Sequence, residues 1–257
     1  MNQYDFIVKT VREAGELLMR LRDEKFETLE KGGDPRDIVT SVDFAVNDFI
    51  IGKIREAFPG DAIYSEEGGG TEAGKNSWAI DPIDGSANFA RNIPHFAICL
   101  AYLVAEVPEA GAVYNPVTNE LFGFKKGGGA FLNDKPIRVS GNTELKSATL
   151  FFRSGRNPEL WDWGGSSYTK LLSAAKGTSN FGGSALDACF VAAGRIEANI
   201  YGGLSTMDIA SAIGILLEAG GRIVNKNGEQ IAYSTEPQTV VMSNCEEIEK
   251  SILKLLF

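Results

Sequence analysis

The chain of 257 residues is acidic, with 34 Asp and Glu against 25 Lys and Arg and a formal net charge of −9. This charge argues against a nucleic-acid partner that would be held through its phosphate backbone. No stretch approaches the ~18 uninterrupted apolar residues of a membrane span, and the N-terminal residues lack the basic and apolar regions of a signal peptide. We therefore expect a globular protein of the cytoplasm, with no membrane partner.

Cysteine and histidine are too sparse for several kinds of site. Cys99, Cys189 and Cys245 lie far apart and show no spacing typical of a zinc site or of a disulfide framework. His95 is the only histidine, which excludes catalytic triads and histidine-ligated metals from the rest of the chain. Because it follows Pro94, a loop role is favoured over a catalytic one.

Apolar periodicity predicts two helices in the N-terminal part of the chain. The apolar stripe of the first comprises Ile7, Val11, Ala14, Leu18 and Leu21. Residues 31–35 contain two glycines and a proline and predict a break. The buried face predicted for the second helix comprises Phe44, Phe49, Ile50, Ile54 and Ala57. Asp43 stands at the start of this helix, where an N-cap role would be a sufficient explanation.

The remaining segments predict a sheet followed by alternating strands and helices. Residues 62–64 predict a short strand, and Glu66 and Glu67 follow shortly after its end. Adjacent side chains on an extended chain point in opposite directions, so both glutamates cannot face one site. Segments 96–104, 111–114, 120–124 and 129–132 predict an antiparallel meander. Residues 145–176 are the least informative region; within them the stretch 153–170, with Trp161, Trp163 and a Gly-Ser run, suggests an exposed loop at the substrate entrance. From residue 178 the alternation predicts a parallel or mixed sheet covered by helices.

The most informative stretch is residues 78–89, Trp-Ala-Ile-Asp-Pro-Ile-Asp-Gly-Ser-Ala-Asn-Phe. Its apolar start predicts the end of a buried strand, and a proline and a glycine then break that strand. Asp81, Asp84 and the carbonyl oxygen of Ile83 are hard oxygen donors, which select magnesium, manganese or calcium over zinc. A helix start at Ser86 would offer free N–H groups to a phosphate. A solvated loop is the usual alternative for two aspartates at this spacing, and these residues alone leave both interpretations open.

This stretch resembles the Trp-x-Ile-Asp-Pro-Ile-Asp-Gly-Thr-x-Asn-Phe motif of the inositol monophosphatase family, part of the lithium-sensitive, magnesium-dependent sugar phosphatase superfamily. Three further family motifs resemble residues 37–43, 65–67 and 207–210, in the same order along the chain. The resemblance covers nearly the whole chain and implies a layered αβαβα sandwich of the α+β or α/β class. It also implies a metal- and phosphate-binding half at residues 1–140, an α/β half at 141–257 that completes the substrate pocket, and a homodimer.

The resemblance implies a site for two or three Mg²⁺ ions, with Mn²⁺ as a substitute. One ion is expected on Glu66, Asp81 and the Ile83 carbonyl, a second on Asp81, Asp84 and Asp208, and a third is held more weakly. Glu67 would be the outward neighbour of Glu66. Clustered carboxylates resist joint ionisation unless cations neutralise them, and an acidic protein that handles phosphate needs such local positive charge.

The implied reaction is hydrolysis of a phosphomonoester by metal-activated water. Asp43 and Ser86, a serine where the family usually has threonine, would orient that water. The residues implied to bind the substrate are Gly85, Ser86, Ala87, Gly183, Ser184 and Tyr201, the first three through backbone N–H groups on the phosphate. We expect a lithium-sensitive phosphatase of small polyol or sugar phosphates, with inositol monophosphate as the leading candidate.

Two positions depart from the family pattern. Tyr201 stands where members acting on inositol usually carry a glutamate that binds ring hydroxyls, and a phenol is not a charged acceptor. Met207 replaces the usual tryptophan, a conservative packing change. Histidinol phosphate, fructose 1,6-bisphosphate and 3'-phosphoadenosine 5'-phosphate are alternative substrates, with Glu197 or Asp187 as a partner for the amine of the first. A non-catalytic binding protein is a further alternative, although it would have no need of four costly carboxylates.

Overall fold

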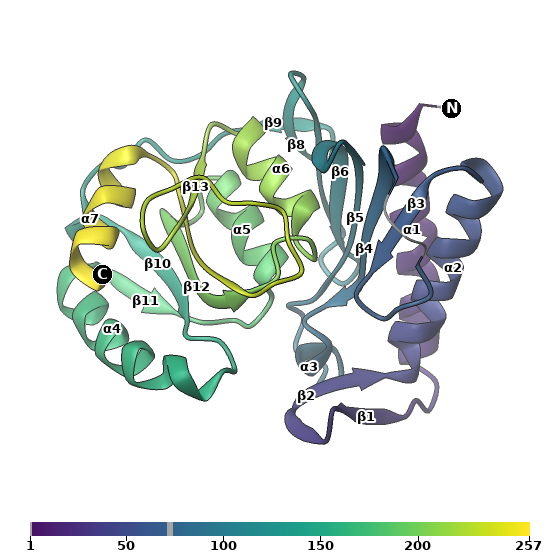
Figure 1. Ribbon diagram of the computed structural model, residues 1–257, viewed down its shortest axis with the longest axis horizontal. Coiled ribbons are helices and arrows are strands. Elements are labelled where there is room, and N and C mark those ends of the chain that lie inside the picture. The colour runs from purple at the N-terminus through teal and green to yellow at the C-terminus, as the bar shows by residue number, and fades with distance from the viewer. Residues whose placement is uncertain (1, 71–73) are drawn as a thin grey trace.

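The structure, a computed structural model, describes residues 2–70 and 74–257 as five layers in which helices alternate with two sheets (Figure 1). Helices α1 (Gln3–Arg22) and α2 (Ser41–Ala57) cover the outer face of a seven-stranded sheet. In spatial order its strands are β3 (Ala62–Ser65), β4 (Asn76–Asp84), β5 (Ala97–Val104), β6 (Val107–Asn115), β7 (Glu120–Lys125), β8 (Gly129–Leu132) and β9 (Lys135–Ile137). From β4 to β9 all neighbours are antiparallel, so the predicted meander is confirmed.

The second sheet is mixed, as predicted. In spatial order its strands are β11 (Gly177–Ser179), β10 (Thr149–Arg153), β12 (Ala198–Leu204), β14 (Gln238–Ser243) and β13 (Arg222–Asn225). Helices α5 (Ser184–Ala192) and α6 (Ala210–Glu218) lie between the two sheets, and α4 (Trp161–Ala174) and α7 (Glu246–Leu256) cover the outer face. The αβαβα sandwich is therefore confirmed, whereas the boundary at residue 140 stays a prediction.

Smaller elements join these layers. The hairpin of β1 (Thr28–Lys31) and β2 (Asp34–Thr40) projects at one end of the molecule, and α3 (Ser86–Phe89) follows β4 (Figure 1). Two 3-10 turns, η1 (Leu145–Ser147) and η2 (Pro158–Leu160), flank β10. No helix among the described residues is long and apolar enough to cross a membrane.

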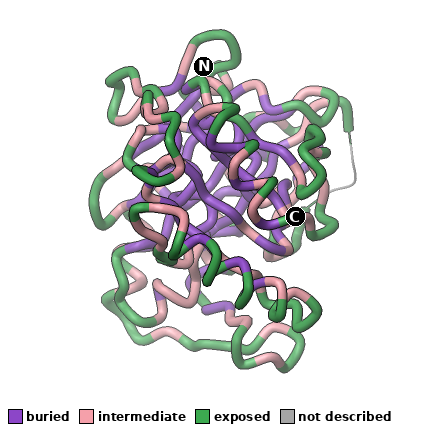
Figure 2. The backbone as a smooth tube through the Cα atoms, turned by 90° about the vertical axis from the view of Figure 1, so that its left-hand side faces the viewer, coloured by how far each residue is buried: buried purple, intermediate pink, exposed green. Residues whose placement is uncertain are grey.

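Apolar clusters between the layers form the core, which runs through the centre of the molecule (Figure 2). The periodicity of α1 is confirmed, because Ile7, Val11, Ala14 and Leu18 are fully buried. The face predicted for α2 is partly wrong, since Phe44 is 39% exposed and Ala57 is also exposed. Its buried apolar residues are Val42, Val46, Ile50, Ile51 and Ile54. The aliphatic residues at spacings of four define the buried face here, and the larger aromatic ones do not.

Two segments predicted to be irregular are regular in the structure. Residues 31–35 contribute to the β1–β2 hairpin, in which Gly32 and Gly33 adopt positive φ at the turn. The loop predicted over residues 153–170 is largely wrong, because residues 161–174 form α4. The Gly-Ser run does not interrupt α4. Gly164 is buried in it and lies so close to Ser154 that a Cβ would collide, so the small residue lets the helix approach the chain after β10.

Candidate active site

Both aspartates of the 78–89 stretch reach one cavity of about 270 Å³ between the two sheets. They lie on β4, where residues three apart would face opposite sides of a regular strand. The pairing of β4 with β5 shifts register between Asp81 and Asp84, which allows both carboxylates to face the cavity. Gly85 then adopts φ 90° and turns the chain into α3, as the sequence predicted.

The cavity collects most of the predicted site from separate parts of the chain. The predicted residues that line it are Glu66, Asp81, Ile83, Asp84, Gly85, Ser86, Ala87, Ser184, Tyr201 and Asp208. Gly183 lies behind this wall, where an added Cβ would come within 3.0 Å of the ring of His95 and 3.3 Å of Asp84 Oδ2. Asp43 is buried and is not a lining residue of the cavity. It is linked to the cavity by its hydrogen bond with Ser86, which does line it.

Burial and mutual repulsion shift the pKa values of these carboxylates. Burial, followed by the charges of Glu66 and Asp84, raises the pKa of Asp81 well above its usual range. Burial also raises the pKa of Asp84, and burial together with Glu66 raises that of Asp208 to about 6. The carboxylates therefore resist joint ionisation, and a cation in the cavity would relieve this cost.

The protein itself provides partners for these carboxylates. Asp84 accepts hydrogen bonds from the backbone N and Oγ of Ser184, at 3.0 and 2.8 Å, and from the backbone N of Ala185 at 2.9 Å. It therefore caps the first turn of α5 and joins the two halves of the site. Tyr64 Oη donates to Asp208 at 2.6 Å, a contact that the sequence did not predict.

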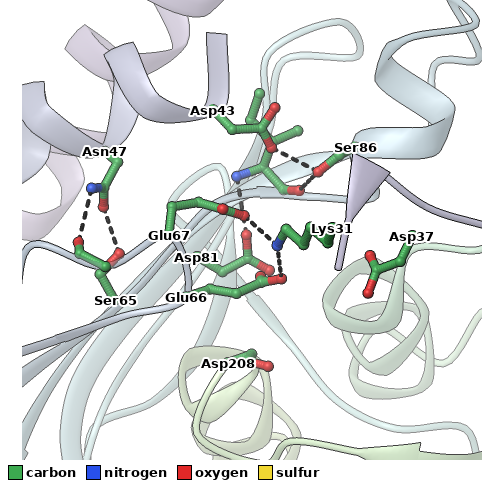
Figure 3. A network of polar contacts seen from close by, with 12 residues as sticks. Lys31, Asp37, Asp43, Asn47, Ser65, Glu66, Glu67, Asp81, Ser86 and Asp208 are labelled. Carbon is green, nitrogen blue, oxygen red and sulfur yellow. Dashed lines mark hydrogen bonds and ion pairs between the residues drawn. The ribbon is translucent and has the colours of Figure 1, made fainter. Parts of the chain in front are cut away.

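Lys31 supplies a positive charge at the acidic end of the site (Figure 3). Its Nζ lies 2.8 Å from Glu66 Oε1 and 2.6 Å from Glu67 Oε1. Burial alone would lower the pKa of Lys31, but the charges and hydrogen bonds of both glutamates outweigh it and raise that pKa. Burial raises the pKa of Glu67 to about 7 in spite of the lysine.

The outward orientation predicted for Glu67 is wrong. Its side chain is 5% exposed, whereas that of Glu66 is 34% exposed. The physical reason is local, because β3 ends at Ser65 and a turn follows. Side chains on a turn do not alternate as they do on an extended strand, so both glutamates reach the same cation.

Asp43 and Ser86 form the hydrogen bond on which the predicted chemistry depends (Figure 3). Ser86 Oγ lies 2.7 Å from Asp43 Oδ1 and 2.9 Å from the carbonyl oxygen of Ile83, and both can accept its proton. Asp43 Oδ2 accepts from the backbone N of Thr40 at 2.9 Å and from its Oγ1 at 2.5 Å. Asp43 is thus the third helical residue of a capping box, and not an N-cap. Burial raises its pKa, while Thr40 and Ser86 lower it.

The donors fit a hard divalent cation in chemistry but are not assembled around one. Within residues 2–70 and 74–257, no three Asp, Glu, His or Cys side chains form a group that could hold a metal ion. Glu66 is paired with Lys31, Asp84 with α5 and Asp208 with Tyr64. Carboxylate and carbonyl oxygens around one cavity nevertheless suit Mg²⁺ or Mn²⁺.

Neither carboxylate considered for the amine of histidinol phosphate is free. Asp187 Oδ1 lies 2.8 Å from Nε2 of His95, and burial raises the pKa of Asp187 to about 6. His95 lies in the irregular chain between α3 and β5, as predicted, but it is only 9% exposed. Its contact with Asp187 joins this chain to α5. Glu197 accepts from Ser140 Oγ and from the backbone N of Thr149. This geometry therefore does not support histidinol phosphate as a substrate.

Several polar residues of the site were not predicted. Lys31 and Tyr64 were assigned only to a break and to a short strand, and Arg153 and Arg156 fell in the segment taken for a loop. Both arginines line the cavity from the second sheet and the chain that follows β10. Two arginines at the end of an apolar segment and just after it, in a strongly acidic chain, were the signal available in the sequence.

Comparison with known protein families shows to which family this chain belongs. A model described as "Inositol monophosphatase family" matches residues 2–256. The chain belongs to the inositol monophosphatase family. The resemblance of its motifs is thereby confirmed, and the protein is a phosphoric monoester hydrolase of a family that is generally metal-dependent.

Relatives with different names are similar to this chain over most of its length. A "Fructose-1,6-bisphosphatase/inositol-1-monophosphatase" of Thermotoga maritima is 34% identical over 230 residues, covering 90% of this chain and 87% of that protein. A "Nus factor SuhB" of Pasteurella multocida is 35% identical, with 86% and 84% covered. "Inositol monophosphatase 2" of Homo sapiens is 33% identical, with 86% and 79% covered. The names of the relatives therefore leave the substrate open.

Solved structures show the same fold. An IMPase structure from Thermotoga maritima superposes with a TM-score of 0.90 at 32% identity, covering 100% of this chain and 97% of that one. Inositol monophosphatase II from Staphylococcus aureus gives a TM-score of 0.85 at 27% identity, with 100% and 94% covered. The layered architecture is therefore that of the inositol monophosphatase family.

Proposed function

We propose that this protein is a Mg²⁺-dependent phosphatase of small polyol or sugar phosphates, with inositol monophosphate as the leading candidate. The hydrogen bond of Ser86 to Asp43, beside a cavity lined by the candidate metal ligands, is the observation that carries the proposal. The ligands would be Glu66, Asp81, the Ile83 carbonyl, Asp84 and Asp208. Two or three Mg²⁺ ions bound there would supply Lewis acidity and a water of lowered pKa.

Ser86 and Asp43 would position the attacking water. Because the Ser86 proton points to Asp43 or to the Ile83 carbonyl, its oxygen can accept a hydrogen bond from a water in the cavity. This contact would direct a lone pair of the water toward phosphorus. Thr40 holds the Asp43 carboxylate in place with two hydrogen bonds. No covalent enzyme intermediate is needed.

The phosphate would lie against the turn from β4 into α3. The backbone N–H groups of Gly85, Ser86 and Ala87 would hold its oxygens and spread the negative charge that grows in the transition state. Ser184 and Tyr201 would border the leaving group, with Gly183 acting through close packing behind them. Lithium inhibition and a homodimer remain parts of this proposal.

The first test is phosphate release, with and without Mg²⁺, from a panel of esters. The panel holds inositol 1-phosphate, histidinol phosphate, fructose 1,6-bisphosphate and 3'-phosphoadenosine 5'-phosphate. We expect Mg²⁺-dependent turnover that favours a sugar or polyol phosphate. Phosphate release that does not depend on a divalent cation would refute the mechanism, and an absence of turnover on every ester would favour a binding protein.

A further inference from the structure

His95, the only histidine of the chain, lies behind the proposed active site and not in it. It is buried and is not among the residues that line the carboxylate cavity. The rings of Phe181 and Phe190 pack on it, with centroids 5.4 and 5.6 Å from that of the imidazole. His95 is therefore placed to act on a bound substrate only through the protein around it.

His95 joins the proposed phosphate-binding turn to helix α5. Its Nε2 lies 2.8 Å from Oδ1 of Asp187, which belongs to the first turn of α5, and both side chains are buried. The carbonyl oxygen of His95 lies against Gly85, where an added Cβ would come within 3.0 Å of it. The same residue therefore contacts the turn after β4 through its backbone and α5 through its side chain.

Asn88 forms a second link between the same two segments. Its Nδ2 donates to the carbonyl oxygen of His95 at 2.8 Å and to that of Phe181 at 2.6 Å. Asn88 belongs to α3, directly after the phosphate-binding turn, whereas Phe181 lies shortly before α5. This amide fixes the backbone of His95 relative to the chain that enters α5, and so it aligns the imidazole with Asp187.

Both links converge on Asp84, the proposed metal ligand that faces α5. The first turn of α5 donates to this carboxylate from the backbone N of Ser184 and of Ala185. Gly183 precedes these donors, and a Cβ added there would lie 3.0 Å from His95 Cδ2 and 3.3 Å from Asp84 Oδ2. The imidazole and the carboxylate therefore pack against the same point of the backbone at the start of α5. A displacement of this turn would move the N–H groups that orient Asp84.

We propose that His95 is a positioning residue for the hydrolysis: through Asp187 it holds the first turn of α5, and with it the carboxylate of Asp84, in place beside the phosphate-binding turn. This inference rests on the proposed function, because the orientation of Asp84 affects hydrolysis only if Asp84 is a metal ligand. Partners behind a ligand typically contribute about 10–100-fold to metal affinity or activity. A histidine that only filled space in the core would contribute to stability alone.

The test removes the hydrogen bond of the imidazole and keeps the packing around it. His95→Phe retains an aromatic ring beside Phe181 and Phe190 but has no partner for Asp187. On the ester that the wild type hydrolyses fastest, we expect kcat to fall about tenfold and KM to change less than about twofold. The dissociation constant of Mn²⁺, measured by calorimetry, should rise about tenfold. In His95→Gln the side-chain amide can donate to Asp187 in place of Nε2 and should restore most of both losses.

Hydrogen exchange of the metal-free protein measures the positioning directly. In His95→Phe the amides of Ser184 and Ala185 should exchange about tenfold faster relative to those of β7, because the first turn of α5 is held less firmly. Glu249→Leu is the matched control, since it removes a buried carboxylate that pairs with Arg222 and lines none of the cavities near the site. It should lower the free energy of unfolding and leave kcat, the Mn²⁺ affinity and this exchange ratio unchanged.

Different results separate the failure of this proposal from that of the proposed function. Unchanged kcat and Mn²⁺ affinity in a folded His95→Phe protein would overturn the positioning role while Mg²⁺-dependent hydrolysis still held. If the unpaired Asp187 prevented folding, the double variant His95→Phe with Asp187→Asn leaves no buried charge unpaired and should show the same losses. If the wild type hydrolysed no ester, the proposed function would fail. An exchange ratio and a Mn²⁺ affinity that His95→Phe did not change would then overturn this proposal as well, whereas faster exchange with weaker Mn²⁺ binding would support it.

Discussion

At the residue scale, Asp84 combines a structural role with a proposed catalytic one. It accepts three hydrogen bonds from the first turn of α5 and also lines the carboxylate cavity. Asparagine keeps one acceptor oxygen and loses the charge that a metal needs. We expect Asp84→Asn to lower kcat/KM by more than about a hundredfold, whereas the free energy of unfolding falls by only about 1 kcal/mol because relieved repulsion offsets lost hydrogen bonds.

Activity assays and urea unfolding of the same preparations measure both effects. Asp23→Asn, at the exposed end of α1, is the matched control and should change neither quantity. Near-normal activity of Asp84→Asn would refute the assignment of Asp84 as a metal ligand.

Tyr64 offers a second test at this scale, as a positioning residue. Its hydroxyl donates to Asp208 and lowers the pKa of that carboxyl, which stays raised at about 6. In Tyr64→Phe the Asp208 pKa should rise further, so protons compete better with Mg²⁺. We expect the half-saturating Mg²⁺ concentration to rise several-fold at about pH 6 and much less at about pH 8. Tyr102→Phe, in β5, is the control, and a pH-independent effect would argue against this role.

At the scale of elements, α4 shows how a run of small residues can form a packed helix. Gly164 faces Ser154 without room for a Cβ, whereas Gly165 has open space around its Cα. We expect Gly164→Ala to destabilise the protein by about 1–3 kcal/mol through overpacking, and Gly165→Ala to stabilise it by up to about 1 kcal/mol through helix propensity. Urea unfolding of the pair isolates the packing effect. Equal effects of the two changes would contradict the close contact between α4 and the chain after β10.

At the scale of the whole molecule, clustered carboxyls make stability depend on pH. The pKa values of Asp187 and Asp208 are raised to about 6 in the folded state, chiefly by burial. Between their unfolded and folded pKa values, the folded protein holds more protons than the unfolded chain. The free energy of unfolding therefore falls as pH rises through this window, by about 3 kcal/mol for a group shifted by two units.

The metal-free protein should accordingly be more stable at about pH 5 than at about pH 7.5. Excess Mg²⁺ should raise the melting temperature, and by more at the higher pH, because the ion binds deprotonated carboxylates. Thermal unfolding with EDTA or with Mg²⁺ across this range measures both trends. A melting temperature that Mg²⁺ leaves unchanged at about pH 7.5 would contradict the proposed metal site.

Local chemistry made much of this molecule predictable from its sequence. The periodicity of α1, the meander β5–β8 and the break after Asp84 depend on residues that are close together in the chain. Their structure could therefore be predicted from the local sequence pattern. The residues predicted around Asp81 and Ser86 do line one cavity, because the 78–89 stretch carries its own strand, bulge and turn. The order of four motifs also sufficed to predict the family.

What only the tertiary structure decided involves contacts between distant segments. Lys31 meets Glu66 and Glu67 through the placement of the hairpin and of the turn after β3, and Tyr64 meets Asp208 across 144 positions. Arg156 and Lys226 share a cavity because β10 and β13 belong to one sheet. No local pattern encodes such pairings, since they depend on how the layers stack. The sequence therefore determined which acidic groups could serve a phosphatase, and the packed layers decided which cations stand beside them.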